Sequence, residues 1–101
     1  MTYARLMDLK FKPGKREEGL SIVADVAKDV REGFEGMLVL LPTDDTDKVA
    51  YVTPWDSESA MSGSWEKIDP KATEALKGVL AEPTVMRTSE VLEMQIISIH
   101  V

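Results

Sequence analysis

The stretch GFEGMLVLLPTDDTDKVAYVTPWDSESAM, from Gly33 to Met61, decides the fold of this chain. It contains two runs rich in β-forming residues, Met37 to Leu41 and Val49 to Thr53, on either side of a loop of Pro, Thr and Asp. The second run leads into Trp55-Asp56-Ser57, where an Asp or Ser side chain can cap the first turn of a helix. The stretch therefore predicts a β-hairpin that leads into a helix.

The residues before this stretch predict one strand and one helix. Every second residue between the first tyrosine and Phe11 shares one face of a half-buried strand, and that face holds Tyr3, Arg5, Met7, Leu9 and Phe11. Pro13-Gly14 ends this strand, and a broad apolar stripe then predicts a helix as far as about Glu32. Gly33 can stop that helix by adopting a left-handed conformation.

The residues after the hairpin predict two helical segments. A short helix capped by Asp56 or Ser57 is expected to run through Met61, where Ser62-Gly63-Ser64 loosens it. Asp69-Pro70 is a typical helix start, because proline suits the first helical position. A second segment is therefore expected from there to Glu82-Pro83, where the next proline ends it.

The order strand, helix, strand, strand, helix, strand predicts an α+β fold of the ferredoxin-like βαββαβ type, with a four-stranded antiparallel sheet and its helices on one face. The last strand is expected between Glu90 and Val101 and could extend ~40 Å, so we expect it to reach beyond its own sheet. The open face is expected to carry Tyr, Met, Val and Trp side chains. Because a monomer rarely exposes so large an apolar patch, we expect a homodimer that joins the open faces.

Composition limits the classes of function. The 101 residues predict one domain over 1–101, and the net charge of −6 is spread along the chain, so no nucleic-acid partner is expected. The absence of cysteine excludes disulfides and thiolate chemistry. No apolar run approaches the ~20 residues of a membrane span, and the first residues alternate where a signal peptide is apolar. A cytoplasmic protein without membrane association is expected.

The loop from Pro42 to Asp47 holds Asp44, Asp45 and Asp47, which raises the question of a cation site. This loop lacks the glycine and the distal bidentate glutamate of a calcium-binding loop. Asp and Thr are also common in solvated hairpin turns. We therefore expect a turn and no metal.

Three short motifs resemble, in their order along the chain, the antibiotic biosynthesis monooxygenase-like family of dimeric α/β barrels. They are Pro13-Gly14 after the first strand, Gly33-Phe34-x-Gly36 after the first helix, and Trp55-Asp56-Ser57-x-x-Ala60-Met61 after the hairpin. The resemblance spans about residues 3 to 95 and implies that two sheets close into a barrel-like dimer, with a pocket between sheet and helices in each protomer. Members include cofactor-free oxygenases that act on quinol-like or polyketide aromatics, haem-degrading enzymes, and proteins with no assigned reaction.

Haem degradation fits the sequence poorly. Haem-degrading members use a histidine after the Trp-containing helix and an asparagine in the first strand. This chain has no asparagine, Met7 stands where that residue would be, and its one histidine is His100, next to the C-terminus. No cofactor is therefore expected.

A cofactor-free oxygenase needs an enclosed apolar cavity and polar groups that help a phenol lose its proton. The candidate catalytic residues are Arg5 as an electrostatic partner, Tyr51 as a hydrogen-bonding wall and Trp55 as a stacking surface. The candidate pocket residues are Met7, Met37, Met61 and Trp65.

Each candidate also has a structural interpretation. Trp55 can be a core residue, Trp65 can cover the short helix or the dimer seam, and Arg5 can pair with Asp8, Glu93 or a carboxylate of the second copy; Arg87 has the same ambiguity. Spacing alone assembles no general base. Two functions therefore stay open: a cofactor-independent monooxygenase acting on a small aromatic of quinol or phenol type, and a non-catalytic dimeric barrel that binds a small apolar ligand or acts as an assembly module.

Overall fold

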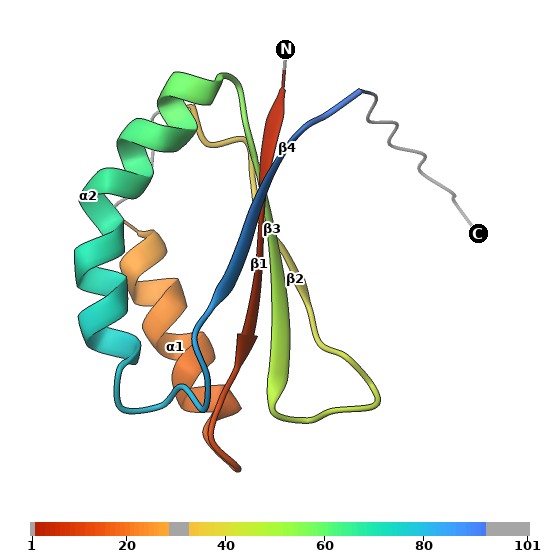
Figure 1. The fold of residues 1–101 in the computed structure, drawn as a ribbon, viewed down its shortest axis with the longest axis vertical. Coiled ribbons are helices and arrows are strands. Elements are labelled where there is room, and N and C mark those ends of the chain that lie inside the picture. Colours follow the sequence, from red (N-terminus) through yellow and green to blue (C-terminus); the bar gives the residue numbers. More distant parts are fainter. Residues whose placement is uncertain (1, 29–32, 93–101) are drawn as a thin grey trace.

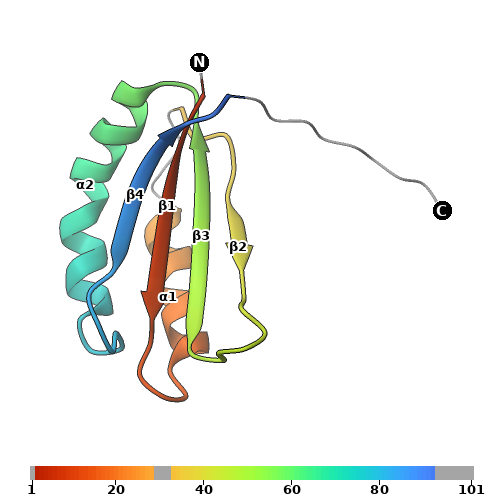
Figure 2. The same ribbon diagram turned by 45° about the vertical axis from the view of Figure 1, so that its right-hand side comes forward.

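The computed structural model describes residues 2–28 and 33–92, and for residues 64–69 it describes the backbone alone. In chain order the elements are β1 (Tyr3–Lys10), α1 (Arg16–Ala27), β2 (Leu38–Leu40), β3 (Lys48–Trp55), α2 (Glu58–Leu76) and β4 (Val85–Glu90). The strands form one four-stranded sheet in the order β2-β3-β1-β4, and each neighbouring pair is antiparallel. Both helices lie on one face of this sheet (Figures 1 and 2). The predicted ferredoxin-like α+β arrangement is confirmed.

The sheet of one chain is open, because β2 and β4 form its two edges. A closed barrel needs a second sheet against its uncovered face. Closure into a dimeric barrel therefore stays a prediction.

The core lies between the sheet and the two helices. The alternate residues of β3 from Val49 to Trp55 are buried, and Met7 of β1 is buried opposite Tyr51. Met7, Val49 and Tyr51 pack with Leu76 of α2 in one hydrophobic cluster. Trp55 packs with Met61 of α2 in a second cluster, so the buried face of the sheet is the one toward the helices. The prediction that Tyr, Met and Trp side chains occupy the open face is wrong. Alternation shows which residues share a face, but not which face the helices cover.

α1 begins shortly after Pro13-Gly14 and carries Glu17 and Glu18 in its first turn, where the helix dipole favours negative charge. The described helix ends at Ala27, and the remainder of the segment predicted to reach Glu32 includes residues 29–32, outside the described part. Gly33 has a φ of +75°, so the predicted left-handed glycine is confirmed.

α2 is one helix of 19 residues, with Pro70 inside it, so the prediction of two separate segments is wrong. Ser57 is the N-cap, as expected: its Oγ accepts a hydrogen bond from the Ala60 N–H at 3.1 Å. Met61 near the start of the helix and Leu76 at its end are both buried. Packing against the sheet therefore holds both halves in line, and this outweighs the local helix-breaking residues.

β4 pairs with β1 along its whole length, from Val85 opposite Asp8 to Glu90 opposite Tyr3. The last strand was predicted to start at Glu90, so that boundary is wrong. The sequence from residue 93 onward lies outside the described residues.

In the described part of the chain, neither helix combines the length and the apolar character that crossing a membrane requires, and no three metal-ligating side chains come together. The aspartates after β2 belong to a turn that a side-chain hydrogen bond stabilises. The Asp45 carboxylate accepts the Asp47 N–H at 2.9 Å and lies 3.7 Å from the Lys10 ammonium. The pKa of Asp45 is lowered, first by that backbone N–H and then by the charges of Lys10 and Lys48.

Candidate functional site

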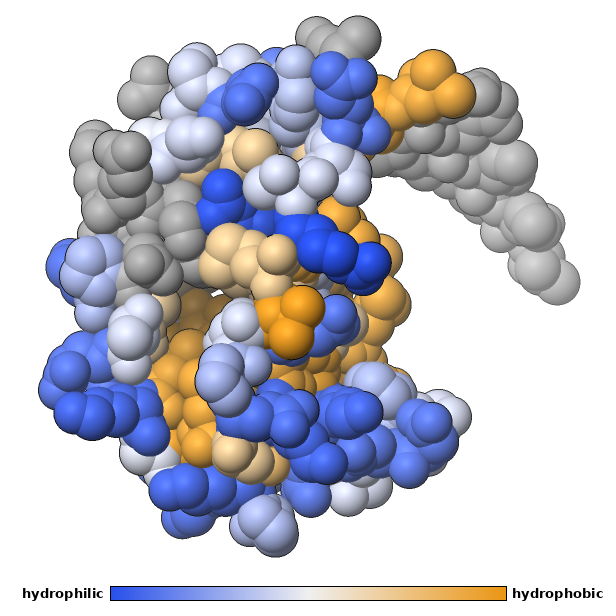
Figure 3. Space-filling model, viewed as in Figure 1, coloured by the Kyte–Doolittle hydropathy of each residue, from blue (hydrophilic) through white to orange (hydrophobic). Residues whose placement is uncertain are grey.

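A cavity of about 530 Å³, called the central cavity below, lies between the sheet and the helices. Residues of β1, β3 and β4 form its sheet side, and residues of α1, α2, the α1–β2 connection and the α2–β4 connection form the rest. An apolar hollow between the helices and β4 is visible in Figure 3. Its size and apolar lining are typical of small-molecule sites.

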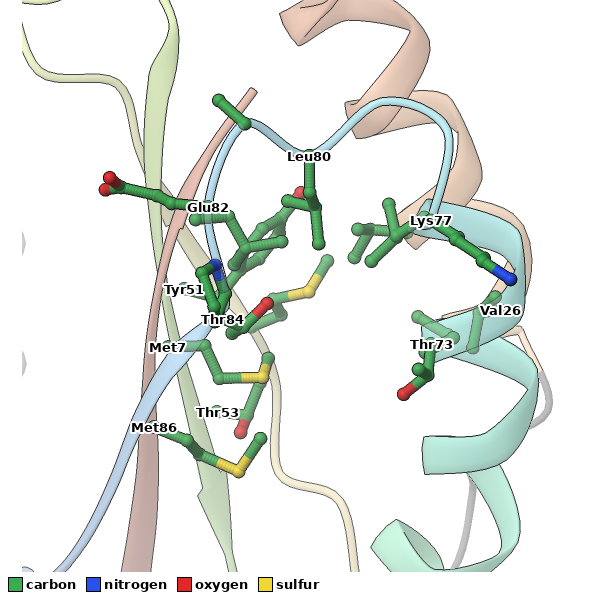
Figure 4. A pocket seen from close by; sticks show the side chains of 18 of the residues that line it. Met7, Val26, Tyr51, Thr53, Thr73, Lys77, Leu80, Glu82, Thr84 and Met86 are labelled. Carbon is green, nitrogen blue, oxygen red and sulfur yellow. The ribbon is translucent and has the colours of Figure 1, made fainter. Parts of the chain in front are cut away.

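The sheet side of the central cavity is built by cross-strand neighbours. Met7 of β1 lies opposite Tyr51 of β3 on one side and Met86 of β4 on the other. The side chains of Met7 and Met86 project from the sheet toward the helices (Figure 4). Thr53 and Trp55 continue the wall along β3.

Tyr51 brings a hydroxyl group to this apolar wall. The residue is only 2% exposed, and its hydroxyl makes no hydrogen bond with any residue in the described part of the chain. Burial raises the pKa of Tyr51 to about 12, so the hydroxyl keeps its proton near neutral pH. A ligand oxygen in the cavity could therefore accept a hydrogen bond from it.

Trp55 is held in a fixed orientation. Its Nε1–H donates to Thr53 Oγ1 at 3.2 Å, and Thr53 Oγ1 in turn donates to the Arg5 carbonyl at 3.4 Å. The Trp55 ring also packs against Phe34, with ring centroids 5.1 Å apart and planes tilted by 57°. One flat aromatic surface is thus fixed beside the central cavity.

Arg5 lies beside this wall, on the same face of β1 as Met7. It is 7% exposed and is not among the residues that line the central cavity. Its Nη1 donates a hydrogen bond to Met86 Sδ at 3.1 Å, and Met86 does line the cavity. A pair with Asp8 is excluded, because strand alternation places Asp8 on the opposite face. A buried positive charge therefore lies one side chain away from the central cavity.

The structure brings together most, but not all, of the predicted pocket residues. Met7, Met37, Tyr51 and Trp55 line the central cavity. Met61 does not line it and packs against Trp55 in a separate cluster, because its position near the start of α2 places it at the far end of the helix layer. Trp65 belongs to the segment whose side chains are not described. The chemical roles of these residues stay predictions.

Several lining residues were missed from the sequence: Thr53, Thr73, Thr84 and Met86. Thr53 follows the same alternation as Tyr51 and could have been found from it. Met86 could not, because the last strand was placed too late in the chain.

The charged residues at the cavity turn away from it. Lys77 and Glu82 contribute to the lining, but the Lys77 ammonium and the Glu82 carboxylate point outward on opposite sides (Figure 4). The interior is therefore apolar, with hydroxyl groups as its polar components.

Comparison with known proteins gives one family. The sequence model of the family described as antibiotic biosynthesis monooxygenase matches residues 2–67. No curated protein matches the chain in sequence.

Similar folds occur in solved structures that bear this family's name. The protein from Chloroflexus aurantiacus J-10-fl superposes with a TM-score of 0.79 at 17% identity, covering 97% of this chain and 100% of that one. The protein from Caulobacter crescentus CB15 superposes with a TM-score of 0.80 at 17% identity, covering 91% of each chain. A protein from Nitrosomonas europaea superposes with a TM-score of 0.80 at 14% identity, covering 90% of each chain. At these identities the likeness concerns the fold alone.

Proposed function

The chain belongs to the antibiotic biosynthesis monooxygenase family, and from that premise we propose that it is a cofactor-independent monooxygenase acting on a small aromatic molecule of quinol or phenol type in the central cavity. The observation that carries the proposal is the cavity itself. It offers about 530 Å³ of apolar space, with the Tyr51 hydroxyl and the Trp55 ring on its β3 side. A flat aromatic ligand with one oxygen substituent fits that chemistry.

The proposed reaction balances without an added reductant. A hydroquinone and O₂ give a hydroxyquinone and water: one oxygen atom forms a new C–O bond on the ring and the other leaves as water. The substrate supplies all four electrons that O₂ accepts. The protein has to bind the ring, favour loss of a phenolic proton and exclude bulk water.

The three candidate residues have distinct proposed roles. The neutral Tyr51 hydroxyl donates a hydrogen bond to the substrate oxygen and stabilises negative charge as it develops there. Trp55 stacks on the ring. Arg5 contributes positive charge from behind Met86, where low dielectric strengthens its effect.

One observation favours the second function, ligand binding without catalysis. Among the lining residues whose side chains are described, the only carboxylate is that of Glu82, and it points away from the cavity (Figure 4). Because burial raises the pKa of Tyr51 to about 12, its hydroxyl stays protonated near neutral pH and does not accept a proton from a substrate. Deprotonation would then depend on water or on the substrate's own acidity.

The test is oxygen uptake with a panel of phenols and quinols under air, together with incorporation of ¹⁸O from ¹⁸O₂ into the product. We expect one O₂ consumed per product molecule. Tyr51→Phe should lower the rate by about 100-fold, because removing one donor to a developing oxyanion costs that much in other enzymes. Tyr3→Phe is the matched control and should change the rate less than about twofold, since Tyr3 does not line the central cavity.

The same panel separates the two functions. Trp55 reports occupancy through quenching of its fluorescence, and the variant Trp65→Phe leaves it as the single tryptophan. Saturable quenching without oxygen uptake would support a binding protein and contradict the monooxygenase.

We also propose that the chain is a homodimer joined through the uncovered face of its sheet. Leu38, Leu40 and Val85 on this face are 55%, 45% and 57% exposed. Leu38 lies opposite Val52, and Val52 lies opposite Leu6, so the apolar surface continues across three strands. Contiguous apolar surface of this kind is typical of a protein interface.

A further inference from the structure

We propose that Met86 is a movable shield between the central cavity and the guanidinium of Arg5, and that a ligand oxygen bonds Arg5 only when Met86 is displaced. The inference rests on the proposed function, because the ligand concerned is the one in that cavity. It assigns to Met86 the control of charge selectivity in the site.

The position of Met86 carries the inference. Its thioether sulfur accepts the Arg5 Nη1–H at 3.1 Å, while its side chain lines the central cavity. Arg5 itself is 7% exposed and does not line the cavity. The sheet register explains this arrangement: Arg5 pairs with Thr88 and Met7 pairs with Met86, so Met86 lies diagonally across from Arg5 on the helix-facing side. The thioether therefore occupies a place where a ligand oxygen could meet the guanidinium.

The bond between Arg5 and Met86 is easily exchanged. A thioether is a weak acceptor, whereas a phenolate or carboxylate oxygen forms a strong, charge-assisted hydrogen bond with a guanidinium. A ligand oxygen that replaces the sulfur thus gives the Arg5 Nη1–H a stronger acceptor.

Met86 is also placed to move. Methionine is unbranched, and its several rotatable bonds let it adapt to a new neighbour. β4 is an edge strand, and Met86 is only partly buried there. Its neighbour Met7 lies on the more central strand β1 and is 9% exposed, so it has less room to change rotamer.

This arrangement has a chemical consequence. With Met86 in place, the cavity offers a neutral wall to an uncharged aromatic. As the ligand oxygen gains negative charge, displacement of Met86 brings that oxygen to Arg5. The strongest interaction then forms with the anion and not with the neutral ligand.

The test compares Met86→Ala with Met7→Ala, both in the Trp65→Phe background. The two changes remove the same side chain from neighbouring positions of one wall, but only Met86→Ala removes the Arg5 contact. The probes are 1-naphthoate and its neutral partner 1-naphthamide, and their dissociation constants are measured by fluorescence quenching and calorimetry under nitrogen.

We expect Met86→Ala to raise the preference for naphthoate over naphthamide by about tenfold, as expected for a hydrogen bond to a charged group. Met7→Ala should leave this preference within about twofold of the wild type. Met86→Leu should also resemble the wild type, because leucine keeps a side chain of similar size between the cavity and Arg5. Met86→Val has a shorter side chain and replaces Met86→Ala if the alanine form is poorly folded by circular dichroism; it should raise the preference in the same direction, and an unchanged preference would contradict the inference.

Equal preferences in the two alanine variants would overturn the inference, and so would failure of both probes to bind any of the proteins. A lack of oxygen uptake would not, because the measurement is of binding in the absence of O₂. The proposed reaction and the shield can therefore fail separately.

Discussion

Gly19 of α1 packs directly against the ring of Phe11. A Cβ added to it would overlap the ring of Phe11, a side chain that is 0% exposed. An alanine in a helix interior is ordinarily better than glycine by about 1 kcal/mol. Forcing Phe11 aside costs about 1 to 3 kcal/mol, so we expect Gly19→Ala to lower the free energy of unfolding by about 1 kcal/mol. Urea denaturation followed by circular dichroism measures this change in the free energy of unfolding.

Gly63 of α2 is the matched control for this prediction. A Cβ added there meets nothing within 4 Å. Gly63→Ala should therefore raise the free energy of unfolding by up to about 1 kcal/mol. If both variants are stabilised, then the Phe11 ring does not pack against Gly19 of α1.

Single residues of the sheet could be predicted well, because a strand repeats every two residues. The alternation placed Arg5 with Met7 on one face of the first strand, and Tyr51 with Trp55 on one face of the strand before the helix. Both groupings are confirmed, and the structure adds that the two faces lie on the same side of the sheet. The alternation could not show that Arg5 lies outside the cavity, because its position there depends on a contact with Met86, on a strand distant in sequence.

At the scale of elements, α2 is unusual because it contains a proline in its interior. Pro70 is exposed and lies within the 19 residues of α2. Proline in a helix interior is about 3 kcal/mol less favourable than alanine, and its stiffening of the unfolded chain recovers up to about 1 kcal/mol. We therefore expect Pro70→Ala to raise the free energy of unfolding by about 2 kcal/mol, measured by urea denaturation.

Pro42, in the connection between β2 and β3, gives the comparison for Pro70. Pro42→Ala should lower the free energy of unfolding by up to about 1 kcal/mol, because its main effect is to increase the conformational entropy of the unfolded chain. A similar loss for Pro70→Ala would mean that Pro70 begins a second helix, as the sequence alone predicts.

The element boundaries that failed share one physical cause. Ser62-Gly63-Ser64 and Asp69-Pro70 are local signals that disfavour a continuous helix, but Met61 and Leu76 bury apolar surface at its two ends. Tertiary packing outweighs local propensity when a helix has a long sheet to cover. The start of β4 was missed for a similar reason: pairing with β1 sets it, and local composition does not.

At the scale of the whole molecule, the sheet has one covered face and one uncovered face (Figure 1). The covered face holds the central cavity, and the uncovered face holds Leu38, Leu40 and Val85. The sequence predicted an apolar open face with Tyr, Met, Val and Trp side chains. Valines lie there, but the Tyr, Met and Trp assignments are wrong, because strands with apolar residues on both faces do not show which face the helices cover. Leu38, Leu40 and Val85, together with their half-buried neighbours Leu6 and Val52, form the apolar surface that a second copy would cover.

The dimer is tested by putting charge on that face. The wild type should sediment at about 22 kDa at micromolar concentration, twice the 11.2 kDa of one chain. Leu38→Lys combined with Leu40→Lys should sediment as a monomer with an unchanged circular dichroism spectrum, because both side chains are already about half exposed in the single chain and charge there opposes burial against a second copy. Ala75→Lys, on the exposed side of α2, should leave the mass at the dimer value. A monomeric wild type would refute the dimer, and a double variant that still sediments as a dimer would place the interface on another surface.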